Sequence, residues 1–356
     1  MKEFWSDDIK NINAYVPGQQ PKDKRYIKLN TNENPYPPSP RVVEDMGIVL
    51  NSDLRLYPDP DGIDLKRLIG ESLNLSQENI FVGNGSDEIL AFCFKAFFNK
   101  ERQILFPDIT YSFYKVYADF FKIPFSELEV DNELKIRVED YKAKNGGIII
   151  ANPNAPTGIL LELSQIEEIL SNNSKSVVIV DEAYIDFGGE SAVRLVGKYK
   201  NLLVVQTFSK SRSLAGLRVG FAIGNKDLIA ALEVVKNCFN SYTLDRLALV
   251  GACSSIKDSD YFNENIKKIV KTRAETKEKL SQLGFYITDS KSNFLFIRYP
   301  TIKAKTILEQ LENRGILVRH FSLDKIENFL RITIGTDDEM NILIRELKKI
   351  LKGEFV

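Results

Sequence analysis

The 356-residue sequence predicts an α/β protein with a mainly parallel sheet between two layers of helices and a smaller α+β domain after it. Short apolar runs alternate with helical patterns from about residue 65 to residue 245. One such run, 177–180, is apolar throughout, as in a strand that is buried on both faces. From about residue 246 a long charged helical stretch and short strands replace this alternation, which indicates a second domain.

The expected elements follow from the chain in order. Polar residues with Pro17, Gly18 and Pro21 predict an N-terminal arm, and the proline-dense segment 34–40 predicts an extended loop. We expect large-domain strands at 80–82, 103–106, 147–151, 176–180, 202–207 and 219–223, and helices at 86–98, 112–120, 164–171 and 226–239. Small-domain helices are expected at 261–283, 303–314 and 337–351, with strands at 293–297 and 329–333. The predicted division is therefore 1–25 for the arm, 26–245 for the large domain and 246–356 for the small domain.

Composition excludes several classes of function. A formal net charge of -1 leaves no basic face for nucleic acid, and no apolar stretch is long enough to cross a membrane. The polar start lacks the apolar region of a signal peptide, and Cys93, Cys238 and Cys253 form neither a disulfide framework nor a metal-ligand spacing. His320 is the only histidine, so a histidine-rich zinc site is excluded and no metal is expected. These features predict a cytoplasmic protein with reduced thiols.

Polar segments follow five of the expected strands, at the point where each strand ends. Because the carboxyl ends of parallel strands share one sheet edge, where open α/β sheets bind ligands, we expect these segments to converge. They are 83–88, 107–111, 152–158, 181–184 and 209–210.

The segment 207–220 is the most informative of these. Lys210 follows a buried strand, and a lysine at the edge of a core can lose its proton and form a Schiff base. Arg218 and the hydroxyls of Thr207 and Ser209 suit a phosphate. Together these residues suggest pyridoxal phosphate, although a basic surface loop is the alternative.

Other candidate residues each have a plainer alternative. Asp181 ends a very apolar strand and can face a pyridinium nitrogen, or it caps the next segment. Ser86 and Asp87 open a helix whose N–H groups can bind phosphate, or they form an ordinary turn. Tyr184 can hydrogen-bond the ring oxygen of the cofactor and Tyr111 can stack on its ring, although an aromatic in such a loop is also a common core residue.

Three residues outside these loops are further candidates. Arg319 and Arg331 can bind an anionic substrate group or form surface ion pairs. Tyr57 either serves a site or packs a turn.

With these motifs in order, the chain resembles the fold-type I pyridoxal-phosphate aminotransferases, and within them the histidinol-phosphate branch. The resemblance runs from about Tyr15 to Leu351 and implies an aspartate-aminotransferase-like fold. Its motifs are 29–35, 57–59, 83–88, 152–158, 181–184, 209–210 with 214–220, and 329–333.

The resemblance implies a role for each candidate residue. Lys210 would bind the cofactor aldehyde and then move the proton between Cα and C4′. The remaining cofactor contacts would be Asp181 at the pyridine nitrogen, Tyr184 at the ring hydroxyl, Tyr111 stacked on the ring, and Ser86, Asp87, Thr207, Ser209 and Arg218 around the phosphate. Arg331 would bind the substrate anion, and Arg319 and Tyr15 the substrate phosphate. Tyr57 would reach the site of a neighbouring subunit, which implies a homodimer.

One position departs from the family pattern. The family commonly has asparagine directly before Pro-Thr-Gly, bonded to the ring oxygen of the cofactor, and this chain has Ala155 there. Either Asn154 takes over by a local shift, which makes it a further candidate ligand, or Tyr184 and a water suffice.

The expected function is transamination between histidinol phosphate and 2-oxoglutarate in histidine biosynthesis. Two alternatives keep the cofactor, namely an aromatic amino-acid aminotransferase and a threonine-phosphate decarboxylase. A third is a cofactor-binding protein with a regulatory or structural role. The expected partners are a small-molecule amino donor and a 2-oxo acid, with no nucleic acid and no membrane.

Overall fold

The computed structural model describes residues 3–10, 12–15, 18–21 and 26–355. Its main feature is a seven-stranded sheet. The strands lie side by side in the order β2 (Ile80–Gly83), β8 (Gly220–Gly224), β7 (Leu202–Thr207), β6 (Val178–Asp181), β5 (Gly147–Ala151), β3 (Ile104–Pro107) and β4 (Phe125–Leu128). Only β8 is antiparallel to its neighbours, so the predicted mainly parallel α/β sheet is confirmed.

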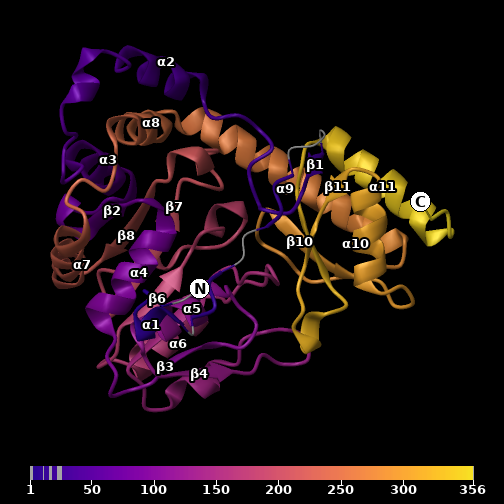
Figure 1. Ribbon diagram of the computed structural model, residues 1–356, viewed down its shortest axis with the longest axis horizontal. Helices are drawn as coiled ribbons and strands as arrows, with labels where there is room; N and C mark the ends of the chain where they lie inside the picture. Colours follow the sequence, from indigo (N-terminus) through magenta and orange to yellow (C-terminus); the bar gives the residue numbers. More distant parts are fainter. Residues whose placement is uncertain (1–2, 11, 16–17, 22–25, 356) are drawn as a thin grey trace.

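Helices cover both faces of this sheet, because alternate strand residues point to opposite sides. Ile149 and Ile179 pack under α4 (Gly85–Phe97), α5 (Phe113–Phe121) and α7 (Lys226–Phe239). Ile148 and Val178 pack against the other layer, which contains α2 (Pro40–Ile48), α3 (Ile63–Leu73), α6 (Leu163–Asn172) and α8 (Arg246–Lys257). These three layers form the left part of Figure 1.

The C-terminal part has a sheet of its own. The antiparallel strand order is β12 (Arg319–His320), β13 (Leu330–Thr333), β10 (Phe294–Arg298) and β9 (Tyr286–Ile287). The long helix α9 (Ser259–Gln282) reaches it from the large sheet, and α10 (Ala304–Asn313) and α11 (Asp337–Leu351) complete the layer on the right of Figure 1. This agrees with an α+β small domain.

Two segments contact elements across the predicted domain boundaries. β1 (Ile27–Lys28) pairs in parallel with β11 (Ile316–Leu317), and Leu29 belongs to the C-terminal core. α8 packs against α2 and α3 of the large domain. The division at residues 25 and 245 stays a prediction.

Shorter elements complete the fold. A four-residue helix, α1 (Asp7–Lys10), lies in the predicted arm, and 3₁₀ turns occur at 52–55, 77–79, 138–142, 185–187, 192–195, 215–217 and 324–326. No helix in the described part of the chain combines the length and apolar character that a membrane span requires.

Candidate active site

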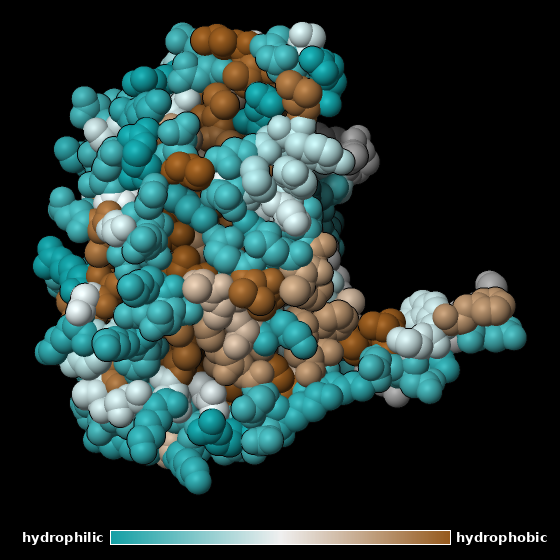
Figure 2. Space-filling view, turned by 90° about the vertical axis from the view of Figure 1, so that its left-hand side faces the viewer, coloured by the Kyte–Doolittle hydropathy of each residue, from teal (hydrophilic) through white to brown (hydrophobic). Residues whose placement is uncertain are grey.

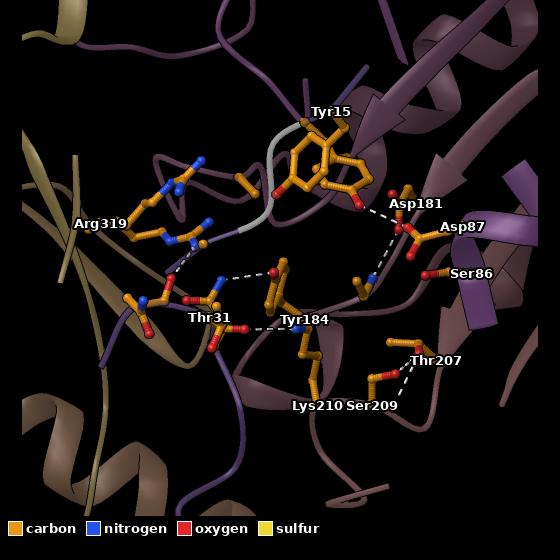
Figure 3. A pocket seen from close by; sticks show the side chains of 18 of the residues that line it. Tyr15, Thr31, Ser86, Asp87, Asp181, Tyr184, Thr207, Ser209, Lys210 and Arg319 are labelled. Carbon is orange, nitrogen blue, oxygen red and sulfur yellow. Dashed lines mark hydrogen bonds between the residues drawn. The ribbon is translucent and has the colours of Figure 1, made fainter. Parts of the chain in front are cut away.

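The predicted polar loops line one cavity at the carboxyl edge of the large sheet. Its volume, with the solvent-filled mouth included, is ≈ 840 Å³. Residues that follow β2, β3, β5, β6 and β7 line it, as strand order predicts, together with residues of the 18–32 segment and the C-terminal sheet. In Figure 3, Lys210 extends between Ser86, Thr207 and Ser209 on one side and Arg319 on the other.

Lys210 is held by the loop after β7 and by the segment before α2. Phe208 is fully buried and anchors the loop in the core, and the backbone N–H of Ser209 donates to Thr207 Oγ1 at 3.1 Å. Asn34 Nδ2 donates to the carbonyls of Lys210 and Ser211, both at 3.1 Å. The lysine Nζ donates to the Thr31 carbonyl at 3.2 Å. Among the described residues, no carboxylate forms an ion pair with it. The amine therefore reaches the cavity without an ionic bond to displace.

Asp181 ends β6 as a buried carboxylate, 5% exposed. Tyr114 Oη donates to its Oδ2 at 2.8 Å, and the backbone N–H of Ala183 donates to Oδ1 at 3.3 Å. Burial raises the pKa of Asp181 to about 6, although both hydrogen bonds act in the opposite direction. A cation bound at this carboxylate would relieve the cost of its burial.

An anion cradle faces the start of α4. Arg218 contacts Ser209 Oγ at 3.3 Å through Nη1 and Asp87 Oδ2 at 3.2 Å through Nη2, and Thr207 Oγ1 lies 3.0 Å from Ser209 Oγ. Gly85 has φ +78, which glycine adopts without strain, and a Cβ there would overlap Arg218 Nη2 and displace the guanidinium. Hydroxyls, a guanidinium and a helix N-terminus together suit a phosphate.

Aromatic side chains cover the cavity above α5. Tyr111 Oη donates to Asp87 Oδ1 at 2.8 Å, and burial raises the pKa of Tyr111, so this phenol stays neutral. Tyr15, from the predicted arm, stacks on Phe113 with ring centroids 4.3 Å apart and lies edge-on to Tyr111 at 6.5 Å. An aromatic wall of this kind suits a flat ring.

Two arginines come from neighbouring strands of the C-terminal sheet. Arg319 in β12 pairs with Arg331 in β13, so both side chains reach the same end of the cavity. Arg331 Nη2 donates to the Asn30 carbonyl at 3.1 Å, while its buried Nε has no hydrogen-bond partner among the described residues. Burial lowers the pKa of the Arg331 guanidinium. An unsatisfied buried donor beside a second cation is suited to an anionic ligand.

The structure does not bring two of the predicted residues to this cavity. Asn154 Nδ2 donates to the Ile109 carbonyl at 2.8 Å, and Ala155 lines the cavity instead. The role of Asn154 as a cofactor ligand stays a prediction, and this geometry does not favour it. Tyr57 is 79% exposed and stacks on Tyr242 at 4.5 Å, outside the cavity of its own chain.

Some residues of the site were given no role from the sequence. They are Asn30, Thr31 and Asn32, which belong to the 29–35 motif and line the cavity, and Tyr114, which orients Asp181. The asparagine-rich run 30–34 was a signal for the first group, since asparagine adopts left-handed backbone conformations and Asn32 has φ 58. Nothing local in the sequence connects Tyr114 to Asp181.

The residues present fit pyridoxal phosphate, the cofactor that the resemblance implies. Asp181 is a buried carboxylate whose burial a cation would offset, Arg218 and the α4 N-terminus form an anion cradle, and Lys210 lines the same cavity. The cofactor has a pyridinium nitrogen that a carboxylate can bind, a phosphate that an anion cradle can bind, and an aldehyde that a lysine amine can bind.

Comparison with known proteins agrees with this geometry. The model of the aminotransferase class I and II family matches residues 24–347. The curated histidinol-phosphate aminotransferase of Brachyspira hyodysenteriae is 55% identical over 99% of this chain and 100% of its own length. That of Clostridium beijerinckii is 54% identical over 99% of each chain.

Solved structures share the fold. The histidinol-phosphate aminotransferase of Clostridium acetobutylicum superposes with a TM-score of 0.84 at 26% identity, covering 92% of this chain and 99% of that one. That of Sinorhizobium meliloti, in complex with pyridoxal-5'-phosphate, gives 0.85 at 20% identity, covering 93% of this chain and 92% of that one.

Proposed function

The chain belongs to the class I and II aminotransferases, which depend on pyridoxal phosphate, and we propose that it transfers an amino group between histidinol phosphate and 2-oxoglutarate. The observation that carries the proposal is the 55% identity, over the full length, to a curated enzyme of that name. Two arginines at one end of the cavity agree with substrates that carry a phosphate or carboxylate.

Each part of the cavity would act on a different part of the cofactor. When bound, the cofactor supplies an aldehyde carbon and an electron-withdrawing ring. The Asp181 carboxylate would keep the ring nitrogen protonated, and Arg218 with the α4 N-terminus would hold the phosphate. The Tyr184 hydroxyl would bind the ring oxygen, and Tyr111 would stack on the ring.

Lys210 would be both the attachment point and the proton carrier. Its Nζ donates to the neutral Thr31 carbonyl and to no carboxylate among the described residues, so it can leave that contact and move a proton at the substrate Cα. Arg331 and Arg319 would orient the substrate by its anionic group, and Tyr15 would close the cavity over it.

The active unit would be a homodimer. Figure 2 shows hydrophobic side chains among the hydrophilic ones on the side of the molecule that lies at the left in Figure 1. The helices α2, α3 and α7 lie on that side, and their exposed hydrophobic side chains include Val43, Ile48, Ile63, Val234 and Phe239, which are 53–73% exposed. A surface of this kind is suited to association with a second copy, which would bring Tyr57 to the neighbouring cavity.

Subunit complementation tests the role of Tyr57. Tyr57→Ala and Lys210→Ala chains are each expected to be weakly active or inactive alone. Mixed dimers would contain one intact site if Tyr57 serves the neighbour, and about a quarter of wild-type activity would return for random mixing. No recovery in mixed dimers would contradict the proposal.

Product analysis tests the reaction. The purified protein is incubated with histidinol phosphate and 2-oxoglutarate, and glutamate is measured with a coupled dehydrogenase, with Lys210→Ala as the control. Glutamate formation is expected from histidinol phosphate at a higher kcat/KM than from phenylalanine or tyrosine. Release of carbon dioxide from threonine phosphate, or preference for an aromatic amino acid, would overturn the assigned substrate.

The proposed compartment is the cytoplasm. The support is that all three cysteines are free, with Cys93 buried and Cys238 exposed, as is usual where thiols stay reduced. Fractionation of the source cells would test it.

A further inference from the structure

Asn32 forms three hydrogen bonds with residues of the C-terminal part, namely Thr333 in β13 and Asn293 before β10. It is 1% exposed, and its backbone N–H donates to Thr333 Oγ1 at 3.0 Å. The same hydroxyl donates to Asn32 Oδ1 at 3.0 Å, and Asn293 Nδ2 donates to the Asn32 carbonyl at 3.0 Å. With φ 58, the residue is in the left-handed region that asparagine tolerates.

These contacts determine which way the Asn32 amide points. Because Oδ1 accepts from Thr333, the NH₂ group is directed at Tyr184, where Nδ2 donates to Oη at 2.9 Å. The tyrosine oxygen is thus an acceptor in this bond, and its own hydrogen is left for a different partner. Figure 3 shows the Tyr184 side chain at the cavity, beside Lys210 and Thr31.

Among the described residues of the loop after β5, no side-chain amide is free to donate a hydrogen bond to a ring oxygen of the cofactor. Ala155 lines the cavity with a methyl group, and the Asn154 amide is bonded to the Ile109 carbonyl and Thr157 Oγ1. The Tyr184 hydroxyl is therefore the side-chain donor that this part of the site presents to a ring oxygen.

The two residues that precede Asn32 accept hydrogen bonds from other side chains of the cavity. The Asn30 carbonyl accepts from Arg331, and the Thr31 carbonyl accepts from Lys210 Nζ. Three consecutive residues thus contact the anion-binding arginine, the lysine and, through the amide, the tyrosine.

We propose that Asn32 is a positioning residue, which directs the Tyr184 hydroxyl hydrogen toward the cofactor ring oxygen and joins this contact to the C-terminal sheet through Thr333. The inference rests on the proposed function for the presence of the cofactor. A hydrogen bond to the ring oxygen stabilises its negative charge, so it lowers the pH at which the bound cofactor loses its proton. The charged groups around Tyr184 are Lys210, with Nζ 5.9 Å from the ring, Arg331, and Asp181 on the same cavity wall.

The test is an absorbance titration of the purified holoenzyme over pH. The variant Asn32→Asp offers a carboxylate that only accepts, so the Tyr184 hydroxyl is expected to turn toward it and away from the cofactor. Loss of a hydrogen bond to a charged oxygen predicts a rise of the titration midpoint by about one pH unit or more. Asn32→Gly keeps the left-handed backbone and removes only the amide, so a smaller rise is expected.

The control is Asn74→Gly, which replaces another asparagine in the left-handed region, with φ 55 at the end of α3, outside the residues that line the cavity. Its midpoint is expected to equal that of the wild type. A second readout separates positioning from binding, since kcat is expected to fall in Asn32→Asp while KM for 2-oxoglutarate stays within about twofold.

The outcomes separate the two proposals. If wild-type protein shows no absorbance band of a bound cofactor, the proposed function fails. If the band is present and the midpoint of Asn32→Asp equals that of the wild type, the role of Asn32 is refuted. If that variant does not fold, Thr333→Val decides, because it removes the acceptor and donor that fix the amide, and an unchanged midpoint there also refutes the role.

Discussion

Replacement of Asp181 by asparagine is expected to stabilise the cofactor-free protein. The carboxylate is 5% exposed, and burial raises its pKa from an ordinary value of 3.8 to about 6. The folded state therefore binds the Asp181 proton more tightly than the unfolded state does. Its contribution to stability is most favourable below pH 3.8, decreases as the pH rises toward 6, and is constant above that.

The magnitude follows from the size of this shift. A difference of about 2 pKa units corresponds to about 3 kcal/mol of unfolding free energy lost above pH 7. Asparagine has one acceptor oxygen, so it keeps only one of the hydrogen bonds from Tyr114 and Ala183, at a cost of about 1 kcal/mol. The expected net gain is about 2 kcal/mol at pH 8 and less than about 1 kcal/mol at pH 5.

Urea unfolding of the cofactor-free proteins at pH 5 and pH 8, at one protein concentration, measures this difference. Glu182→Gln is the matched control, because burial also raises the pKa of Glu182, to about 7, and its side chain does not line the cavity. Both variants should gain stability relative to the wild type as the pH rises. Added pyridoxal phosphate should stabilise Glu182→Gln as much as the wild type and Asp181→Asn much less.

Equal stability of wild type and Asp181→Asn at both pH values would refute the reasoning. It would mean that the buried carboxylate carries no electrostatic penalty in the absence of the cofactor. A gain at pH 8 accompanied by unchanged stabilisation by pyridoxal phosphate would refute the pairing of Asp181 with the ring nitrogen.

Three further substitutions test the other parts of the cavity. Lys210→Ala should lower kcat by at least about a thousandfold and abolish covalent attachment of the cofactor, which borohydride reduction and peptide mapping would detect. Gly85→Ala should weaken cofactor binding and destabilise the protein by about 1–3 kcal/mol, since φ is +78 and Arg218 blocks the Cβ; equal affinity in a fluorescence titration would contradict the cradle. Arg331→Met should raise KM for 2-oxoglutarate by about ten- to a hundredfold in steady-state assays, and an unchanged KM would exclude Arg331 as the anion ligand.

The large sheet could be predicted because its central strands are buried on both faces. Runs such as Leu202–Val205 are apolar throughout, and this pattern does not depend on distant contacts. The edge strand β4 was missed because its residues are only partly buried and include Ser126 and Glu127. The two-residue strands β1 and β11 were missed because neither has a pattern of its own and each needs the other.

The site was predictable only where it follows from strand order. Residues after parallel strands meet at one edge, which placed Asp181 and Lys210 together without any knowledge of their contacts. The bond from Thr333 to Asn32 joins residues 301 positions apart, and that from Tyr114 to Asp181 joins residues 67 apart. Such pairs are set by the packing of the two sheets and two helix layers, so a single sequence contains no local signal for them.

The side chains that line the cavity carry more positive than negative charge. Its lining includes four cations, Lys210, Arg218, Arg319 and Arg331, and two carboxylates, Asp87 and Asp181, an excess of two positive charges in a chain whose formal net charge is -1. Positive charge is therefore concentrated here while the rest of the chain is acidic, which favours the entry of anions. The cations divide into Arg218 at the α4 end and two arginines at the C-terminal sheet, with Lys210 between them. An arrangement of two anion sites on either side of an amine matches a phosphorylated cofactor that meets an anionic substrate at the lysine.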